Sequence, residues 1–299
     1  MMTGIPDPAG YIQSLQKLGI KVLLSLGGAS SNVPNTTVSF HDAFAAAPDP
    51  ATFETTFKAS LDTLVTTYGF DGFDFDIEHG LIPSGTFTQP TGDIAVLSSI
   101  INSYHLSKPE LLLSLVPQIA NISATSGFND TFGNYSSLIM QTYTSLSWVA
   151  IQLYNAGCAF GIDCNCWDPN TLTTTPDPAV AFVTDLLAPW PSTCPAGQAS
   201  GFQAYTGPLV PSQVVLGYPV KNGQGNSDGQ PPAVLLEVKR ALQCLRTGVQ
   251  GSDSCDTYLP PTPYPTIGGV FSWNINYDAS NAYAFATGIY ACAVAGTCT

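Results

Sequence analysis

The sequence predicts an α/β barrel, in which short parallel strands alternate with covering helices. Two observations predict this class. Apolar runs alternate with amphipathic segments along the chain, and its 299 residues are 44% hydrophobic, which is enough for one large core. We expect six strands, at residues 21–26, 72–77, 111–116, 148–154, 214–220 and 269–273. The sequence shows neither an internal repeat nor an interdomain linker, so we predict a single domain over residues 1–299.

Helices are predicted between these strands, because apolar residues recur there at three- and four-residue intervals. One apolar stripe runs from Phe53 through Leu61 to Tyr68, and a second runs from Leu97 to Tyr104. Further helices are expected at residues 11–18 and around Val183, Leu242 and Ala284. Loops are expected at residues 30–50, 121–134, 156–201, 221–232 and 255–266, with a helix near 179–188 inside the third. Long loops after strands are where such barrels carry function.

Charge and composition restrict the partners of the chain. Only 10% of residues are charged, against an average of about 25%, so the surface relies on neutral polar side chains. The net charge is −13 with 8 Lys and Arg, which disfavours phosphate backbones and anionic lipids. We therefore expect no nucleic-acid or membrane partner, and no stretch is long enough to span a membrane. A neutral substrate, no cofactor, no metal and a monomeric state are expected instead.

The cysteines indicate an oxidising, secretory route. All eight lie in the second half of the chain, and four glycosylation sequons accompany them, at Asn35, Asn121, Asn129 and Asn134. A metal site is the alternative, but Cys158, Cys164 and Cys166 lack a matching second pair. We predict disulfides that mainly pin loops at one end of the barrel, with the pairing left open. Secretion is expected although the first residues do not form a signal peptide.

Residues 71–78 (DGFDFDIE) form the segment on which a catalytic function depends. Alternate side chains of a strand point to the same face, so Asp74, Asp76 and Glu78 should share one face and the apolar residues between them the other. Three stacked carboxylates in a low-dielectric interior cannot all ionise cheaply. At least one should hold or share a proton near neutral pH, as a general acid requires. A solvated acidic edge strand is the alternative, and the apolar second face argues against it.

With these residues the chain resembles glycoside hydrolase family 18, the chitinases and endo-β-N-acetylglucosaminidases. The family signature Asp-x-x-Asp-x-Asp-x-Glu is intact at Asp71, Asp74, Asp76 and Glu78, and Asp71 is expected where the chain enters the strand. The sequence DIEHG at 76–80 is similar to the fungal and plant type III chitinase branch. Five further motifs follow in the family's order: SLGG at 25–28, VPQ at 116–118, QLYN at 152–155, LGYP at 216–219 and GVFSW at 269–273. The resemblance covers the chain from about Gly19 onward and implies a TIM (β/α)8 barrel.

The resemblance also implies a retaining mechanism in which the substrate assists its own cleavage. Glu78 would protonate the glycosidic oxygen and then activate water. Asp76 would orient the 2-acetamido group of the substrate, whose carbonyl oxygen attacks the anomeric carbon. Asp74 would share a proton with Asp76 and help to switch its charge.

Other positions acquire supporting roles from the same resemblance. Tyr154 would hydrogen-bond the acetamido carbonyl, and Trp273 would form an apolar floor under the distorted sugar. Gln118, Gln152 and Asn155 would line the same subsite as polar contacts. We interpret Ser25, Gly27 and Gly28 mainly as residues of tight backbone packing at a strand end.

Three functions are compatible with this sequence. The first is a chitinase that hydrolyses β-1,4-linked N-acetylglucosamine polymers. The second is an endo-β-N-acetylglucosaminidase that cuts the chitobiose core of N-glycans by the same chemistry, because loops choose the substrate. The third is a non-catalytic lectin or inhibitor on the same fold, against which the intact acidic motif argues.

The family pattern also leads us to expect a barrel that lacks its beginning. In the family, the Ser-x-Gly-Gly motif closes the third strand, yet here it starts at Ser25. An eight-strand barrel would then miss strands one and two. We expect a natural precursor longer at its N-terminus by roughly 50–80 residues. Residues 1–299 alone should be poorly soluble or weakly active, because a six-strand sheet leaves two open edges.

Overall fold

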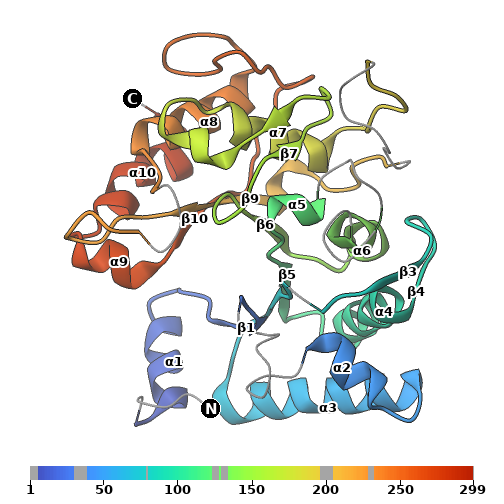
Figure 1. The fold of residues 1–299 in the computed structure, drawn as a ribbon. Helices are drawn as coiled ribbons and strands as arrows, with labels where there is room; N and C mark the ends of the chain where they lie inside the picture. The colour runs from blue at the N-terminus through green and yellow to red at the C-terminus, as the bar shows by residue number, and fades with distance from the viewer. Residues whose placement is uncertain are drawn as a thin grey trace. The chain divides into compact units, whose positions relative to one another are not determined.

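The computed structural model describes residues 6–29, 39–78, 80–122, 128, 134–195, 205–227 and 232–298. The chain forms two compact units (Figure 1). Unit 1 comprises residues 1–116 and 141–147, and unit 2 comprises residues 117–140 and 148–299. Each unit contains three parallel strands and the helices that pack on them. The six strands stand where the sequence analysis expects them, so the α/β class is confirmed.

The sheet of unit 1 has the order β1–β2–β5, with both pairs parallel. Its strands are β1 (Leu23–Gly27), β2 (Gly72–Asp76) and β5 (Leu112–Leu115). The register places Ser25 of β1 and Ser114 of β5 level with Asp74 of β2. One acidic residue of the central strand therefore lies between two serines.

Unit 1 also contains four helices and one small hairpin in its described part. They are α1 (Pro8–Gln16), α2 (Phe40–Ala45), α3 (Pro50–Tyr68), α4 (Gly92–Ser107), and the antiparallel pair β3 (Pro83–Gly85) and β4 (Pro90–Thr91). The carboxylate of Asp49 accepts the backbone N–H of Thr52 at 3.0 Å and caps α3. Gly69 ends this helix in the left-handed conformation at φ 76°.

The predicted apolar stripes of these helices are confirmed. Phe53 and Leu61 of α3 are buried, and so are Leu97, Ile101 and Tyr104 of α4. The loop expected at residues 30–50 is partly wrong, because α2 occupies its second half; residues 30–38 lie outside the described part. The ring of Phe40 lies 5.4 Å from that of Phe53, so aromatic packing on α3 stabilises this short helix.

The sheet of unit 2 has the order β6–β9–β10, again with parallel pairs. Its strands are β6 (Trp148–Gln152), β9 (Val214–Pro219) and β10 (Gly269–Trp273). The helical segments are α5 (Ile119–Ile122), α6 (Asn134–Thr142), α7 (Asp177–Leu187), α8 (Leu235–Thr247), α9 (Ile275–Ser280) and α10 (Ala284–Ala295), with 3₁₀ turns at Pro169–Thr173 and Pro211–Gln213. One helix was expected to be centred near Ala284. The structure instead has two helices there, because α9 ends at Ser280 and α10 begins at Ala284.

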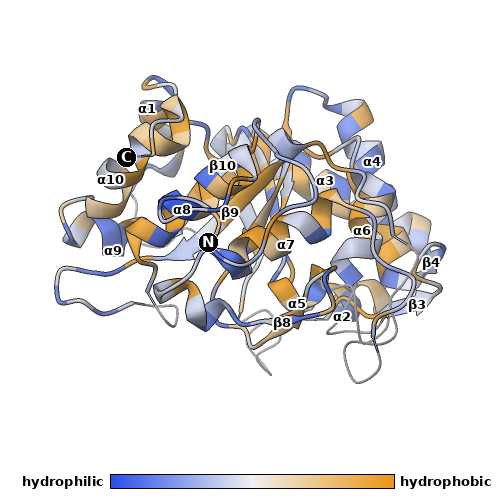
Figure 2. Cartoon of the chain, turned by 90° about the horizontal axis from the view of Figure 1, so that it is seen from above, coloured by the Kyte–Doolittle hydropathy of each residue, from blue (hydrophilic) through white to orange (hydrophobic). Residues whose placement is uncertain are grey.

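Helix α7 is the most deeply buried helix of the described chain. Every residue from Asp177 to Leu186 is buried, and Figure 2 shows α7 and β9 as largely hydrophobic. Its position inside the long segment 156–201 confirms the helix expected at 179–188. The same segment also contains an antiparallel hairpin of β7 (Ala159–Phe160) and β8 (Cys166–Trp167), which the sequence analysis treats as loop.

All eight cysteines are paired, which confirms the disulfide interpretation. The pairs are Cys158–Cys166, Cys164–Cys194, Cys244–Cys255 and Cys292–Cys298. The first two lie within the segment 156–201, as expected for loop pinning. The other two anchor the helices α8 and α10 to the segments that follow them, so the expected emphasis on one end of the barrel needs correction.

Two of the four sequons are buried in the folded chain. Asn121 and Asn134 are 4% and 2% exposed, so a glycan at either position would require local rearrangement. Asn35 and Asn129 lie outside the described residues.

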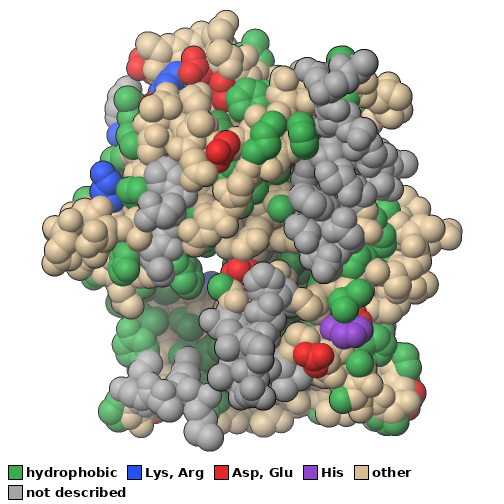
Figure 3. Space-filling model, in the orientation of Figure 1, with side chains coloured by type: hydrophobic (Ala, Val, Ile, Leu, Met, Phe, Trp, Pro, Cys, Tyr) green, Lys and Arg blue, Asp and Glu red, His purple; other side chains and the backbone are tan. Residues whose placement is uncertain are grey.

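The surface carries few charges, as the composition predicts. On the face shown in Figure 3, Lys, Arg, Asp and Glu side chains are scattered among neutral and hydrophobic ones. None of the helices in the described part of the chain is both long and apolar enough to span a membrane.

The close pairing of β2 with β5 leads to a stability prediction at Gly72. A Cβ atom at this position would overlap the backbone carbonyl oxygen of Leu112, its register partner on β5. Gly72→Ala should therefore force the strands apart and lower the free energy of unfolding by about 1–3 kcal/mol. Urea unfolding would measure the change. Gly251→Ala is the matched control, because no atom lies within 4 Å of its added Cβ; equal stability of both variants would contradict this account.

Candidate active site

The two faces of β2 differ as the sequence predicts. Phe73, Phe75 and Ile77 are 0%, 1% and 6% exposed, whereas the three carboxylate residues between and after them remain partly accessible. The ring of Phe73 packs edge-on against Tyr104 of α4 at 6.0 Å. Because the apolar side chains are buried, Asp74 and Asp76 share the opposite face of the strand. Glu78 follows two residues after the end of β2, where its backbone N–H donates to the carbonyl oxygen of Asp76 at 3.2 Å.

Asp74 is held from both sides by serine hydroxyls. Ser114 Oγ donates a short hydrogen bond to Oδ1 of Asp74, and Ser25 Oγ donates to Oδ2 at 3.3 Å. Both contacts follow from the parallel register, since all three residues lie at one level of the sheet. Each carboxylate oxygen therefore has its own donor, and the Asp74 side chain is fixed in orientation.

Burial controls the protonation of Asp74. It raises the pKa of Asp74 from 3.8 to about 6, although the hydrogen bonds from Ser114 and Ser25 act to lower it. Asp74 is therefore the candidate for the carboxyl group that is predicted to hold a proton near neutral pH. The main cause of its raised pKa is desolvation rather than repulsion between carboxylates. Because the pKa of the folded state is raised, the protonated carboxyl contributes stability that is complete below pH 3.8 and is lost as the pH rises through about 6.

The backbone of β1 lies close to Asp76. Gly28 N–H donates to the carbonyl oxygen of Asp76 at 2.6 Å, and a Cβ on Gly27 would overlap that carbonyl group. Both glycines have positive φ, 114° and 93°, which other residues rarely adopt. A Cβ on Gly28 would lie 3.9 Å from Oδ2 of Asp76, so this glycine leaves space beside the carboxylate. These contacts agree with a packing role for Gly27 and place Gly28 next to a candidate catalytic group.

Asp71 has a different environment from the other acidic residues. It precedes β2, and its carboxylate accepts the N–H of Val22, the side-chain amide of Gln16 and the ammonium of Lys21, each at 2.9 Å. Burial acts to raise the pKa of Asp71, but these hydrogen bonds and the charge of Lys21 outweigh it, so the pKa is lowered. Asp71 thus joins α1, β1 and β2 as an ionised anchor, in keeping with its expected place at the strand entrance.

Four of the predicted site residues lie at or near the end of β6. Gln118 and Gln152 form an isolated parallel bridge, and Gln152 N–H donates to the carbonyl oxygen of Pro117 at 2.9 Å. Gln152 and Tyr154 are 3% and 5% exposed. Asn155 follows in the left-handed conformation at φ 51° and is exposed. The chain therefore turns immediately after the strand, where the side chains of a parallel sheet form sites.

Trp273 ends β10, two strands away from β6 in the sheet of unit 2. Its carbonyl oxygen accepts the N–H of Val220 at 2.9 Å, and its peptide bond to Asn274 is cis. The residue is 43% exposed, which is high for an indole at a strand end and leaves it accessible to a ligand.

Unit 1 thus brings together Asp74, Asp76, Ser25, Gly27 and Gly28, with Glu78 two residues beyond β2, and unit 2 brings together Gln118, Gln152 and Tyr154. Ser114, which is fully buried and donates to Asp74, is a site residue that was not predicted from the sequence. Its signal was available, because Ser114 is the one polar residue in the apolar run 111–116 of the next predicted strand. Within the described residues, no group of His, Cys, Asp and Glu is arranged to hold a metal ion.

This chain is similar to several chitinases of known structure or sequence. It is 54% identical to the ChiA C-terminal domain of Legionella pneumophila, with a TM-score of 0.93 over 97% of this chain and 85% of that one. It is 26% identical to a family GH18 chitinase from Chromobacterium violaceum, with a TM-score of 0.71 over 95% of this chain and 67% of that one. Chitinase D of Niallia circulans is 28% identical over 90% of this chain, which spans 48% of that protein's length. A search of family models matched none.

Parallel α/β units with an acidic strand, together with these neighbours, define a TIM-barrel-like α/β protein of the glycoside hydrolase class. More specifically, the chain belongs to glycoside hydrolase family 18. Fungal as well as bacterial chitinases are among its relatives, including a probable class II chitinase of Arthroderma benhamiae at 27% identity over 92% of this chain and 77% of that protein.

The serine contacts yield a prediction about the titration of Asp74. Ser114→Ala removes a hydrogen bond that favours the ionised carboxylate, so the pKa of Asp74 should rise further, by about one unit. Ser25→Ala should have a smaller effect, because the hydroxyl of Ser25 lies at the longer distance of 3.3 Å. Carboxyl-selective NMR titration of the two variants measures both shifts. An unchanged or lowered pKa in Ser114→Ala would show that this hydroxyl does not stabilise the anion.

Proposed function

We propose that the chain is a chitinase that hydrolyses β-1,4-linked N-acetylglucosamine polymers with retention of configuration. The observation that carries the proposal is the acidic face of β2, on which Asp76 follows the serine-held Asp74, with Glu78 two residues after the end of the strand. The 54% identity to a ChiA domain over nearly the whole chain supports the substrate class. The proposal assigns residues of both units to one catalytic domain.

The proposed reaction has two steps, and the substrate supplies the nucleophile. In the first, the carbonyl oxygen of the 2-acetamido group attacks the anomeric carbon while Glu78 gives its proton to the leaving glycosidic oxygen. This forms an oxazolinium ion, whose positive charge the Asp76 carboxylate stabilises. In the second, water attacks the anomeric carbon, the acetamido oxygen leaves, and Glu78 takes the water's proton, which restores its starting state.

Asp74 has the properties of a proton reservoir for Asp76 in this scheme. Its pKa of about 6 allows both protonation states near neutral pH, and the serines hold the carboxylate in one orientation. When the pKa of a group is close to the working pH, proton transfer requires little free energy in either direction. Asp76 can then hold or release a shared proton as charge develops on the substrate.

The remaining assignments concern substrate position. The hydroxyl of Tyr154 would donate a hydrogen bond to the acetamido oxygen, and Trp273 would support the apolar face of the sugar. The 43% exposure of Trp273 supports the second role. Gln118, Gln152 and Asn155 would bind the sugar hydroxyl and amide groups.

Secretion and a monomeric state are part of the same proposal. Four disulfides in a chain of this size support an oxidising compartment, because cytosolic thiols are kept reduced. An insoluble polymeric substrate also requires an enzyme that works outside the cell.

The role of Glu78 is tested by replacing its carboxyl group with an amide. Glu78→Gln keeps the shape and removes the proton, so hydrolysis of colloidal chitin should fall by about 10²–10⁴-fold while oligosaccharide binding is retained. Asp71→Asn is a useful comparison, since it should reduce stability rather than turnover in the folded enzyme. Turnover near that of the unmodified enzyme in Glu78→Gln would exclude Glu78 as the acid. Parallel assays on a high-mannose glycoprotein distinguish a chitinase from an endo-β-N-acetylglucosaminidase.

Substrate assistance makes a stereochemical prediction. The product of hydrolysis should first be released as the β-anomer, since the configuration is inverted twice. Substrates that lack the acetamido group at the cleaved position should not be hydrolysed. Proton NMR during early turnover measures the anomer ratio, and the α-anomer as first product would rule out this mechanism.

A further inference from the structure

A pocket lies in unit 2. Its described lining residues include none of the proposed catalytic or substrate-binding residues. It has a volume of about 490 Å³ and is formed by two segments, residues 162–167 and residues 257–261. This is within the range of roughly 300–1,000 Å³ typical of small-molecule sites. Among the residues that the structure describes, the lining contains one carboxylate, Asp163, and neither Lys nor Arg. A phosphate or carboxylate ligand would therefore find no opposite charge there.

The first wall is the β7–β8 hairpin, which presents the indole of Trp167 in a fixed orientation. The indole Nε1–H donates to both oxygens of Asp163, at 3.0 and 3.1 Å, and the amide of Asn165 donates to the same carboxylate at 2.8 Å. The disulfide Cys158–Cys166 closes the hairpin beside Trp167, and Cys164–Cys194 joins its turn to a distant segment. Because Asp163 already accepts hydrogen bonds from these donors, its charge is largely satisfied within the protein.

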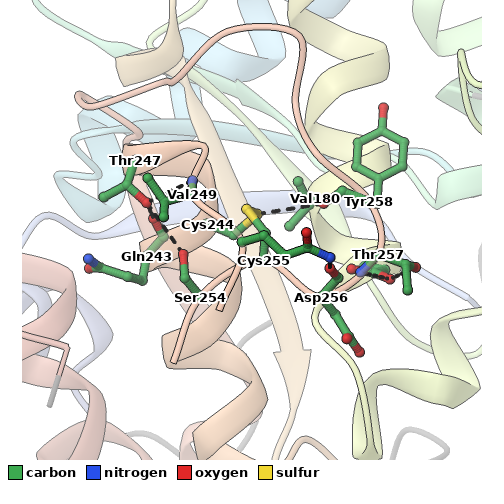
Figure 4. Close-up of a disulfide and its surroundings, with 12 residues drawn as sticks. Val180, Gln243, Cys244, Thr247, Val249, Ser254, Cys255, Asp256, Thr257 and Tyr258 are labelled. Atoms are coloured by element: carbon green, nitrogen blue, oxygen red, sulfur yellow. Dashed lines mark hydrogen bonds between the residues drawn. A yellow bond between two sulfur atoms is a disulfide. The ribbon is translucent and has the colours of Figure 1, made fainter. Parts of the chain in front are cut away.

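The second wall follows directly on another disulfide. Cys255 is joined to Cys244 of α8, and Thr257 and Tyr258 come immediately after it (Figure 4). The rings of Tyr258 and Trp167 meet edge to face, with centroids 5.5 Å apart and planes at 89°, so the two walls are in contact. Leu259 stands at the rim and is 48% exposed. The pocket thus combines aromatic and aliphatic surface with two exposed polar residues, Asn165 and Thr257. The amide of Asn165 donates to Asp163 and the hydroxyl of Thr257 donates to Asp177.

Helix α7 holds both walls through two buried carboxyl groups. Asp185 Oδ1 accepts the N–H of Ile162 at 2.8 Å in the first wall. Asp177 Oδ2 accepts the N–H of Thr257 at 3.1 Å, and also its hydroxyl, in the second wall. The two aspartates are 0% and 2% exposed, and the second oxygen of each has no partner among the described residues. Burying a carboxyl group with one oxygen unpaired is unfavourable. The contacts of Asp177 and Asp185 therefore indicate that α7 holds the two walls in place, rather than that the pocket is an incidental gap between loops.

We propose that this pocket is an accessory sugar-binding site that takes one or two pyranose rings of a neutral glycan. The apolar C–H face of a pyranose fits the aromatic and aliphatic surface of Trp167 and Leu259. A sugar hydroxyl can donate to Oγ1 of Thr257, which still accepts a hydrogen bond while it donates to Asp177, and another can approach the exposed Asn165. The described lining offers no basic side chain to an acidic sugar, and the internally satisfied Asp163 favours a neutral ligand over a cation. Three disulfides and two buried aspartates preorganise the site, which reduces the entropy that binding must overcome.

On a polymeric substrate such a site would act by avidity. If the proposed chitinase function holds, the glycan is a chitin chain, and binding a second segment of it raises the effective concentration of the substrate at the enzyme. The sugar site itself depends on the pocket and not on the catalytic proposal.

The test uses the full chain with Glu78→Gln, so that the glycan is not consumed. Adsorption isotherms on crystalline chitin are compared for this protein and for versions that also carry Trp167→Ala, Leu259→Ser or Leu106→Ala. Trp167→Ala should weaken adsorption by about 3- to 10-fold, and Leu259→Ser should weaken it less. Leu106→Ala is the matched control, because this leucine is 81% exposed and lies in α4; adsorption should not change. In NMR titrations with chitotetraose, the indole N–H signal of Trp167 should shift.

Equal adsorption of all versions, or an indole signal that does not move with either chitotetraose or cellotetraose, would overturn the sugar site. If Trp167→Ala fails to fold, Leu259→Ser and the indole signal in the folded protein still decide. A shift with cellotetraose but not with chitotetraose would uphold the pocket while contradicting chitin as the substrate. Failure of the catalytic proposal is measured separately, by chitin hydrolysis that survives in Glu78→Gln.

Discussion

The candidate active site depends on one constraint, the parallel register that sets Asp74 between Ser25 and Ser114. Strand alternation then places Asp76 on the same face as Asp74, and Glu78 follows after the end of the strand, while Phe73 and Phe75 hold the strand against the helices. A shift of one residue would turn the carboxylates toward the apolar layer and the phenylalanines toward the site. Hydrophobic burial on one side of β2 therefore stabilises the chemical arrangement on the other.

The environment of each carboxylate determines what it can do. The ionised carboxylate of Asp71 accepts three hydrogen bonds, so it stabilises the entrance to the strand. Asp74 is three residues away, but burial raises its pKa to about 6, which suits a group that holds and releases a proton. Identical side chains thus differ in role because the sheet desolvates one and surrounds the other with hydrogen-bond donors. The same principle applies in unit 2, where burial raises the pKa of Asp185 well above its ordinary range and its carboxyl group anchors a loop through Ile162.

The loops of unit 2 are held by disulfides and polar contacts as well as by buried side chains such as Leu172 and Tyr258. The hairpin of β7 and β8 contains only two residues in each strand, yet a disulfide and the Asp163 contacts hold it. Helix α7 provides the rigid base, since its apolar side chains are buried throughout. Long loops held in this way can present side chains such as Trp167 at fixed positions, as a binding site on a barrel-like scaffold requires.

The six strands, the main helices and the acidic face of β2 were predictable from the amino-acid sequence, because apolar periodicity and strand alternation are local properties of the chain. The pairing of the cysteines was predictable too, because no metal-ligand spacing accompanied them. Three features required the folded chain: which cysteines join, the contact of Ser114 with Asp74, and the support that Asp177 and Asp185 give to two walls of one pocket. These contacts link residues far apart in the chain, and strand register and helix packing, rather than any local pattern, bring them together.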